Sequence, residues 1–393
     1  MTSGKHIAFF TAPSHGHVYP MLGIVEELAG RGHRVSYATT TDFAGAVAAA
    51  GARPVLYAST MPSPGDRGRR WPETITESMT LFLSEAAATL PALREAFAAD
   101  RPDVVAVDDL AGAGAVLAAA WGIPVVQIWP FFAANAHWSL PLHAPAAQRP
   151  KPAAMFRYGT DLTALLRSAG LRMPVPQYFA TRPSGGVVLL PRAFQFRGET
   201  FGPEFSFVGP CLGSRGFQGE AAPASADRPT LLISLGTSFN DRPEFYAMCL
   251  EAFAGEPWHV VMAVGDRIRR EQLPPVPENI EVHARVPQLA VLARAGAFIT
   301  HAGMGSIMEG LAHGVPLVAI PQVFEQEVNT ERLTALGLGV SLRRDAITAE
   351  GLRDAVRRAD SPEVRAAVGR MRAEVQAGGG AAAAADAIAK IAG

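Results

Sequence analysis

Residues 300–329 read THAGMGSIMEGLAHGVPLVAIPQVFEQEVN, and this stretch decides the interpretation of the chain. The apolar residues 297–300 predict a strand that leads directly into a turn containing two glycines and a serine. The residues that follow the turn favour a helix. This order of elements presents unpaired backbone N–H groups at the helix N-terminus, where a phosphate group binds well.

Acidic and amide side chains follow this turn at short intervals. Glu309 lies about one turn into the predicted helix, where its carboxylate can reach the hydroxyl groups of a ribose. A further strand over residues 316–320 precedes Glu325 and Gln326, which offer hydrogen-bond partners to other hydroxyl groups. Partners for phosphate, ribose and a second sugar within one stretch predict a nucleotide-sugar ligand.

Composition favours a globular protein with reduced thiols. The 393 residues, of which 49% are hydrophobic, suffice for two to three domains of about 150 residues each. A formal net charge of −1 gives no general attraction to nucleic acid or anionic lipid, so we expect neither as a partner. Cys211 and Cys249 are far apart, which argues against a disulfide framework.

We expect a cytoplasmic protein without a membrane segment. The apolar run over residues 7–10 is too short for a signal peptide. Residues 110–148 contain no Asp, Glu, Lys or Arg, but Gly122, Pro124 and Pro130 interrupt them. No span of about 20 apolar residues remains, so the segment is interpreted as buried core.

The first half follows a strand–helix–strand pattern. Strands are predicted over residues 6–10, 35–39, 104–107 and 125–128, with an Ala-rich helical segment over residues 113–121. A loop over residues 11–19 precedes a helix that begins at Pro20, because proline suits a first helical turn. The apolar spacing of this helix predicts one buried face. The pattern is that of a parallel sheet with helical crossovers.

Residues 210–228 lack periodicity and form the best linker candidate. The second half then predicts strands over residues 231–234, 259–264, 280–283, 298–300 and 316–320, and a helix over residues 244–254. The fold class is therefore α/β, with two doubly wound parallel-sheet domains. Such domains bind ligands at the carboxyl ends of their strands, and two that face each other would bind them in the inter-domain cleft. The predicted boundaries are residues 1–210, 211–229, 230–376 and 377–393.

The first strand of the second half ends in Ser234, Gly236 and Thr237. Glycine permits close backbone approach, and the hydroxyl groups can donate to a phosphate. Alone, this turn is a weak signal; combined with the later turn it predicts a diphosphate site. The later turn contains His301, Gly303, Gly305 and Ser306. The structural alternatives are that His301 only hydrogen-bonds to the backbone and that Gly303 and Gly305 are ordinary turn residues.

The first βα loop contains candidates for a general base. An alcohol that attacks a sugar carbon must lose its proton, and a neutral imidazole near pH 7 suits that role. A carboxylate on the other ring nitrogen sets the tautomer and stabilises the imidazolium. His15 and His17 compete for the role of base, and Asp108 is the carboxylate candidate. Asp109 points to the opposite face, so it is interpreted as a helix N-cap, and the pair forms no metal site.

Taken together, these motifs resemble the donor-binding signature of the family 1 glycosyltransferases, which include plant flavonoid and bacterial macrolide enzymes. The resemblance implies the GT-B fold, with residues 377–393 crossing back onto the N-terminal, acceptor-binding domain. It further implies inverting transfer of a hexose, with glucose as the preferred guess, from a UDP- or TDP-sugar to a hydroxyl of a lipophilic acceptor. Macrolides and phenolic natural products are such acceptors. No metal and no cofactor are expected.

The resemblance also assigns individual roles. The family's Gly-His-x-x-Pro pattern maps onto residues 16–20, which makes His17 the base and Asp108 its partner. His15 is then structural or lines the acceptor pocket. His301 would contact the β-phosphate and Glu309 the ribose, while residues 303–306 line the diphosphate.

Two positions depart from the family pattern. Where most members have Trp-x-Pro-Gln, this chain has Arg285, Val286, Pro287 and Gln288. A guanidinium plane can also stack on a base, and uracil is preferred to thymine. Gln288 would contact the base edge or serve as a polar turn residue. Where most members have Asp-Gln, this chain has Glu325 and Gln326. Glu325 would accept hydrogen bonds from sugar hydroxyls, and a solvated loop acid is the alternative.

Aromatic residues concentrated in the first half predict an apolar acceptor pocket, with ordinary core packing as the alternative. Residues 61–71 and 133–160 are interpreted as loops over this pocket. The candidate lining residues are His15, Trp71, Phe82, Trp129, Phe131, Phe132 and Trp138.

Three other functions compete with the glycosyltransferase. A sugar-nucleotide epimerase shares the fold plan but needs no base in the first loop. A non-catalytic nucleotide-sugar-binding protein would need no base and carboxylate pair. A dinucleotide oxidoreductase is disfavoured, because the first loop lacks Gly-x-Gly-x-x-Gly. A monomer or weak homodimer is expected.

Overall fold

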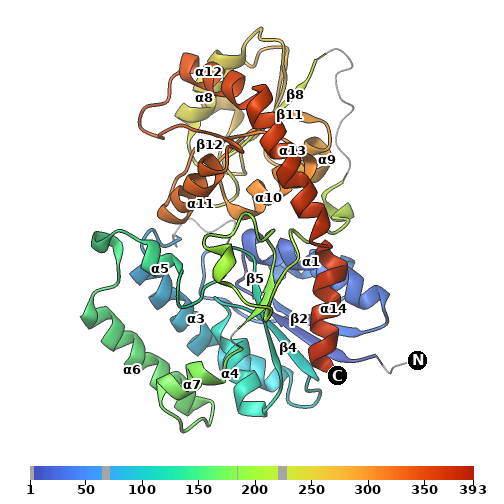
Figure 1. Ribbon diagram of the computed structural model, residues 1–393, viewed down its shortest axis with the longest axis vertical. Coiled ribbons are helices and arrows are strands. Elements are labelled where there is room, and N and C mark those ends of the chain that lie inside the picture. Colours follow the sequence, from blue (N-terminus) through green and yellow to red (C-terminus); the bar gives the residue numbers. More distant parts are fainter. Residues whose placement is uncertain (1–3, 64–70, 184, 220–227) are drawn as a thin grey trace. The chain divides into compact units, whose positions relative to one another are not determined.

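The computed structural model describes residues 4–63, 71–183, 185–219 and 228–393, and it divides into two compact units (Figure 1). Unit 1 contains Met1–Arg215 and Gly378–Gly393, and unit 2 contains Gly216–Ala377. The division falls inside the predicted linker, residues 211–229, of which residues 220–227 lie outside the described ranges. Each unit has its own parallel sheet and its own buried core.

Unit 1 contains a seven-stranded, fully parallel sheet of order β3-β2-β1-β4-β5-β6-β7. The strand order reverses between β1 and β4, which makes this pair the topological switch point. The strand positions predicted from the sequence are confirmed. The strands are β1 (His6–Phe10), β2 (Arg34–Thr39), β3 (Arg53–Leu56), β4 (Val104–Asp108), β5 (Val125–Trp129), β6 (Gly186–Val188) and β7 (Phe205–Phe207).

Helices cover both faces of this sheet because successive residues of a strand point to opposite sides. Ile7 and Phe9 pack with α1 and α2, whereas Ala8 and Phe10 pack with α3, α4 and α6. All four strand residues are buried. The helices are α1 (His15–Gly30), α2 (Thr41–Ala49), α3 (Ile75–Ala96), α4 (Gly112–Trp121), α5 (Leu140–His143), α6 (Pro152–Ser168) and α7 (Val175–Thr181).

Two boundary predictions in unit 1 were wrong. Helix α1 begins at His15 rather than at Pro20. Pro20 lacks an N–H and so removes only the one hydrogen bond to the carbonyl of Gly16, which the helix tolerates. The predicted loop over residues 133–160 contains α5 and the start of α6, where a proline occupies the first helical turn. Most of the other predicted loop, residues 61–71, lies outside the described part of the chain.

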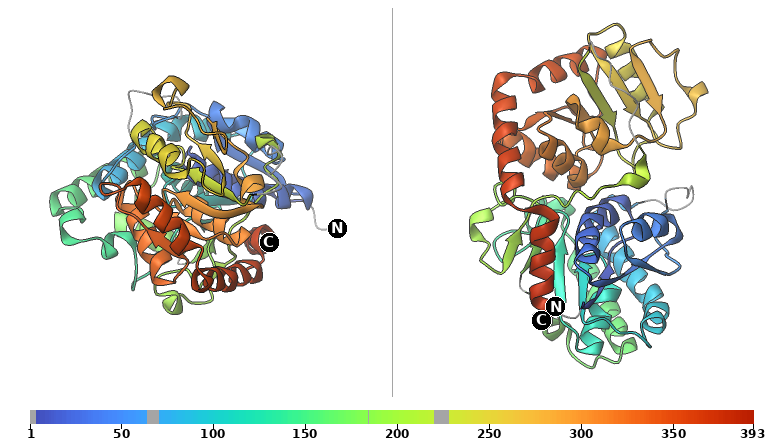
Figure 2. Two further views of the ribbon diagram at one scale, coloured as in Figure 1. Left: turned by 90° about the horizontal axis from the view of Figure 1, so that it is seen from above. Right: turned by 90° about the vertical axis from the view of Figure 1, so that its right-hand side faces the viewer.

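The C-terminal helix α14 (Gly380–Ala392) belongs to unit 1 and lies alongside α1 (Figures 1 and 2). Its buried side chains join the core that surrounds β1 and β4. Arg31 connects the two helices: it donates to Glu27 on its own helix at 2.7 Å, to Asp386 at 2.5 Å and to the carbonyl of Ala382 at 3.1 Å. The apolar face of α14 provides most of the attachment, because exposed ion pairs contribute about 0–1 kcal/mol.

Unit 2 repeats this plan with a six-stranded parallel sheet of order β10-β9-β8-β11-β12-β13, whose order reverses between β8 and β11. Helices α8 and α12 pack on one face, and α10 packs through Gly310 against Phe298 and Leu317 on the other. The predicted strands are confirmed here too. The elements are β8 (Thr230–Ser234), α8 (Pro243–Phe253), β9 (His259–Ala263), β10 (Ile280–His283), α9 (Gln288–Leu292), β11 (Ala295–Thr300), α10 (Met304–His313), β12 (Leu317–Ala319), α11 (Phe324–Ala335), β13 (Gly339–Ser341), α12 (Ala349–Ala359) and α13 (Pro362–Ala377).

Across the described ranges of both units, none of the helices has the length and apolar character that a bilayer-spanning segment needs.

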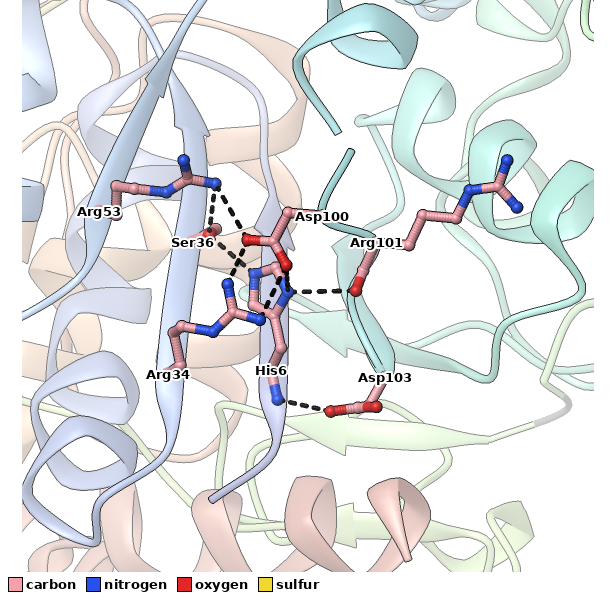
Figure 3. A network of polar contacts seen from close by, with 7 residues as sticks. All are labelled: His6, Arg34, Ser36, Arg53, Asp100, Arg101 and Asp103. Carbon is pink, nitrogen blue, oxygen red and sulfur yellow. Dashed lines mark hydrogen bonds and ion pairs between the residues drawn. The ribbon is translucent and has the colours of Figure 1, made fainter. Parts of the chain in front are cut away.

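A polar network joins the amino ends of the unit 1 strands (Figure 3). The ring of His6 is 3% exposed, and its Nε2 lies 2.8 Å from the hydroxyl of Ser36. The backbone N–H of His6 donates to Asp103 at 2.7 Å, and Arg34 pairs with Asp100. These contacts connect β1, β2 and the segment before β4 at the edge opposite the carboxyl ends.

The stability of unit 1 should fall as this network is acidified. Burial, reinforced by the charge of Arg34, lowers the pKa of His6 below its usual 6.5, although the carbonyl of Arg101 and Asp100 act in the opposite sense. Below pH 6.5 the unfolded chain therefore binds a proton that the folded protein does not, and the free energy of unfolding decreases. Denaturant titrations at several pH values should show a smaller acid loss in His6→Gln than in the wild type.

The exposed His137 supplies the control for this measurement. His137→Gln should keep the acid loss of the wild type. Equal pH profiles for wild type and His6→Gln would contradict the assignment.

Candidate active site

The switch point of unit 1 brings the predicted catalytic pair together. His17 lies in the first turn of α1, directly after β1, and Asp108 is the last residue of β4. Their side chains meet with Nδ1 of His17 and Oδ2 of Asp108 2.8 Å apart. The Asp108 side chain is 0% exposed and that of His17 is 16% exposed. Solvent therefore reaches the imidazole of His17 but not the carboxylate of Asp108.

Backbone donors hold the Asp108 carboxylate in place. Besides His17, Oδ2 accepts from the N–H of Ala12 at 3.0 Å. Oδ1 accepts from the N–H groups of Leu110 at 3.0 Å and Ala111 at 2.7 Å. Four donors around one buried carboxylate fix its orientation and compensate for its loss of water.

This arrangement selects the tautomer of His17. An ionised carboxylate can only accept hydrogen bonds. The contact with Asp108 therefore requires that Nδ1 of the His17 ring carry the proton. Nε2 then holds the lone pair, which is the form a general base needs. The predicted base and its predicted carboxylate partner therefore lie within hydrogen-bond distance, and their catalytic role stays a prediction.

Asp109 differs from its predicted role as a helix N-cap. The N-cap of α4 is Ala111, and the nearby backbone N–H groups bind Asp108 instead. Asp108, the last residue of β4, accepts from these N–H groups because its carboxylate faces this loop. Asp109 has a buried Oδ1 without a hydrogen bond among the described residues. Burial, and then the charge of Asp108, raise the pKa of Asp109 to about 7, against smaller effects of His17 and Arg182.

The predicted acceptor residues divide into two groups. Phe132 and Trp138 are buried in an aromatic cluster, in which Phe132 stacks on Phe194 and Trp138 on Phe196. These two rings therefore contribute to core packing.

The other predicted acceptor residues are partly exposed. The ring of Phe131 lies edge-on to that of His17 at 5.9 Å, next to the candidate base. His15 packs edge-on against Tyr19 and Phe43, which supports a structural role for this ring. The remaining residues of this group are Trp71, Phe82 and Trp129.

A cavity of about 670 Å³ lies elsewhere in unit 1, between α3 and α6. Its walls combine polar side chains such as Arg157 and Asp161 with alanines and leucines. None of the seven predicted acceptor residues lines it. It is therefore distinct from the surface that Phe131 and His17 share.

In unit 2 the predicted diphosphate residues also gather at the switch point. Ser234 ends β8 and pairs with Thr300 at the end of β11, so both following turns begin at the same edge. His301 lies between two glycines: a Cβ added to Gly236 would approach its ring to 2.4 Å, and one added to Gly303 would approach Nε2 to 2.4 Å. Gly236 also has φ +74, a conformation that favours glycine.

The imidazole of His301 is uncharged near neutral pH. Burial lowers the pKa of His301 to about 4, more than the backbone of Ser234 raises it. Its Nδ1 is buried without a hydrogen bond in the described part of the chain. We expected this ring to help balance phosphate charge, but a neutral ring offers a hydrogen bond instead. The positive end of the α10 dipole remains available for charge compensation.

The predicted ribose residue and a predicted base contact touch each other. Nε2 of Gln288, at the start of α9, donates to Oε2 of Glu309 at 2.6 Å. Glu309 is 6% exposed and lies in the middle of α10. Its carboxylate is thus oriented by a neighbouring side chain rather than by solvent.

Glu325 and Gln326 lie in the first turn of α11. Glu325 is exposed, as the solvated alternative requires, yet its Oε1 also accepts from Asn329 at 3.2 Å. Gln326 is buried, and its Oε1 accepts from the backbone N–H of Gln322 at 2.8 Å. This contact fixes the orientation of the Gln326 side-chain amide.

Arg285 occupies the position of the family's tryptophan and is exposed. Its guanidinium forms an ion pair with Asp266 that includes a 3.0 Å bond from Nε. The plane of this group is therefore held by the loop after β9. Val286, the next residue, is half-buried, whereas Thr237 in the other turn is exposed.

Two asparagines at this site were not predicted. Asn240 donates to the carbonyl of Gly236 at 2.7 Å, and Asn329 donates to the carbonyl of Ala302 at 3.0 Å. Both stabilise turns that the sequence analysis singled out. The spacing of Asn329 four residues after Glu325 on a helix is the signal that would have found it. Within the described ranges, no group of three or more His, Cys, Asp or Glu side chains is arranged to hold a metal ion.

Two doubly wound units, each with polar residues at its switch point, have the architecture of the GT-B fold, and comparison with known proteins identifies the class as glycosyltransferases. Residues 250–389 match the family described as erythromycin biosynthesis protein CIII-like, C-terminal domain. An NDP-glycosyltransferase, YjiC, of Bacillus licheniformis is 40% identical over 98% of this chain and 97% of its own length. The oleandomycin glycosyltransferase of Streptomyces antibioticus is 39% identical over 98% and 91%.

A solved structure gives the same result. The calicheamicin glycosyltransferase CalG4 superposes with a TM-score of 0.85 at 40% identity, over 99% of this chain and 98% of its own. The chain therefore belongs to the family 1 glycosyltransferases of the GT-B fold, and its relatives are macrolide and natural-product glycosyltransferases. The family prediction is confirmed and favours a transferase over the epimerase.

The contact between Gly303 and His301 predicts opposite effects for two neighbouring glycines. Gly303→Ala should lower the free energy of unfolding of unit 2 by about 1–3 kcal/mol, the usual range for overpacking, because its methyl group overlaps the ring. Gly305→Ala should leave it unchanged or raise it by up to about 1 kcal/mol, because nothing lies within 4 Å and alanine favours a helix. Chemical denaturation followed by fluorescence measures both. Equal effects of the two variants would contradict the described packing.

Proposed function

We propose that this protein transfers a hexose, preferably glucose, from a UDP-sugar to a hydroxyl group of a lipophilic small molecule, with inversion at the anomeric carbon. Family membership supports the transferase chemistry. Relatives named for UDP-glucose support the choice of donor, and those named for oleandomycin and demethyllactenocin support a macrolide-like acceptor.

The observation that carries the proposal is the 2.8 Å hydrogen bond between His17 and the buried Asp108. Three backbone donors compensate for the burial of the Asp108 carboxylate, and the fourth contact turns Nδ1 of His17 toward it. This arrangement has a chemical use, since a base must accept a proton on Nε2 while the other nitrogen stays protonated. The neighbouring Phe131 supports binding of an apolar acceptor beside this ring.

The donor is assigned to the switch point of unit 2. The backbone N–H groups at the start of α10 and the neutral ring of His301 would bind the diphosphate, and Glu309 the ribose. Glu325 and Gln326 would bind the hexose hydroxyls. Because the helix N-terminus compensates part of the phosphate charge, the proposed reaction uses no metal ion. Arg285 would stack on the uracil base.

The proposed reaction is a single displacement. Nε2 of His17 takes the proton of the acceptor hydroxyl as its oxygen attacks C1 of the hexose. The bond between C1 and the diphosphate oxygen breaks, and its electron pair leaves with the nucleoside diphosphate. Asp108 stabilises the imidazolium that forms. The acceptor gains one hexose, and the anomeric configuration is inverted because attack and departure occur on opposite faces.

Incubation with candidate substrates tests this function directly. UDP-glucose and TDP-glucose, each with a panel of macrolides and phenols, should yield an acceptor heavier by one hexose in mass spectra. UDP-glucose should give the larger yield. Conversion of the nucleotide-sugar without any acceptor would instead favour the epimerase.

Removal of the base should slow turnover without weakening the binding of the donor nucleotide. His17→Ala should lower kcat by about 100-fold or more, as for loss of a general base, while the affinity for UDP is retained. Steady-state kinetics and calorimetry measure the two quantities. His33→Ala, at the amino end of β2, should behave like the wild type. Normal turnover in His17→Ala would refute the assignment.

Glu309 should act on the donor alone. Glu309→Ala should raise the donor KM by about tenfold or more, because hydrogen bonds to a charged group contribute about 1.5–3 kcal/mol. The acceptor KM should stay the same. Glu350→Ala removes an exposed carboxylate from α12 and is the matched control. An effect confined to acceptor binding would contradict the placement of ribose at Glu309.

A further inference from the structure

The turn that follows β11 contains a strained residue. Ala302 has φ +62, which is the left-handed region, and is 0% exposed. Outside glycine this conformation is unfavourable, and it persists where surrounding groups enforce it. Ala302 lies between His301 and Gly303, so its conformation directs the backbone N–H groups that open α10.

Two side chains satisfy the backbone of Ala302. Its N–H donates to the hydroxyl of Thr300 at 3.2 Å, and its carbonyl accepts from Nδ2 of Asn329 at 3.0 Å. Thr300 is the last residue of β11, directly before this turn, whereas Asn329 reaches the turn from α11. The hydrogen bond from Asn329 therefore attaches this turn to α11.

Asn329 also binds a predicted sugar contact. The same Nδ2 donates to Oε1 of Glu325 at 3.2 Å. Both neighbours of the amide nitrogen are acceptors, so the orientation of the amide group is determined. The Asn329 side chain is 0% exposed and therefore does not itself contact solvent.

We propose that Asn329 is a positioning residue that holds the diphosphate-binding turn and the sugar-binding carboxylate in register. This inference deepens the proposed function and rests on it. One proton of the amide keeps Ala302 in the left-handed conformation, and the other directs Glu325. Asn329 thereby sets the distance between the groups that bind the diphosphate and the group that binds the hexose.

Asn329→Leu tests the proposal, because leucine has a similar shape and no hydrogen-bonding group. Without the amide, the turn loses its support and the carbonyl of Ala302 is left unpaired. The Kd for UDP should rise by about tenfold, in line with the loss of a buried hydrogen bond. The KM for UDP-glucose should rise by about a further threefold, because Glu325 is also released. The KM for the acceptor should not change.

Thr330→Val is the matched control. Thr330 is buried on the same helix, and its hydroxyl donates to the carbonyl of Gln326 within that helix. In this variant the Kd for UDP and the KM for UDP-glucose should stay within about twofold of the wild type. Such a change is small beside the change of about tenfold expected for Asn329→Leu. Thermal unfolding of both variants would show that each is folded.

A second substitution separates the two roles of the amide. Ala302→Gly removes the conformational strain, since glycine adopts positive φ readily. In the Asn329→Leu background it should return the Kd for UDP to within about threefold of the wild type. The additional loss for UDP-glucose should persist, because glycine does not restore the contact to Glu325.

The outcomes distinguish this inference from the proposed function. If the wild type binds neither UDP nor TDP in calorimetry, the proposed function fails and this inference fails with it. If the wild type binds UDP and Asn329→Leu binds it equally well, the positioning role alone is wrong. Equal rescue of UDP and UDP-glucose by Ala302→Gly would refute the connection to Glu325.

Discussion

The buried carboxylate of Asp108 is the constraint on which the candidate site of unit 1 depends. A carboxylate with 0% exposure is stable only if donors replace water, and here four do so from three positions in the chain. The N–H of Ala12 fixes the end of β1, His17 fixes the first turn of α1, and the loop after β4 closes around Oδ1. The same contacts that compensate for burial therefore also orient the imidazole, so that stability and the proposed chemistry share one set of hydrogen bonds.

Both units use their topology in the same way. The strand order reverses between β1 and β4 in unit 1 and between β8 and β11 in unit 2, and doubly wound sheets bind their ligands at such a point. The predicted catalytic pair of unit 1 and the predicted diphosphate residues of unit 2 follow those strands. In unit 2 the small size of Gly236 and Gly303 makes room for His301, and asparagine side chains hold the turns. The backbone thus presents donors there, whereas unit 1 presents the candidate base.

Most of the fold was predictable because buried parallel strands are continuous apolar runs, as in residues 6–10 and 231–234. The start of α1 was not, since Pro20 favours a first turn but is also tolerated one turn later. The pairing of His17 with Asp108 followed from a family motif, and the geometry agrees with it. The neutrality of His301 and the role of Asn329 depend on burial and on contacts between helices, which one sequence does not reveal.

The central claim is that one imidazole deprotonates an acceptor that displaces the nucleoside diphosphate in a single step. The configuration at the anomeric carbon of the product tests it most directly. With an α-linked UDP-glucose donor, the proton NMR spectrum of the purified product should show only the β-anomer. An α-linked product would mean retention of configuration, which a single displacement from the opposite face cannot give, and it would contradict the account of His17 and Asp108.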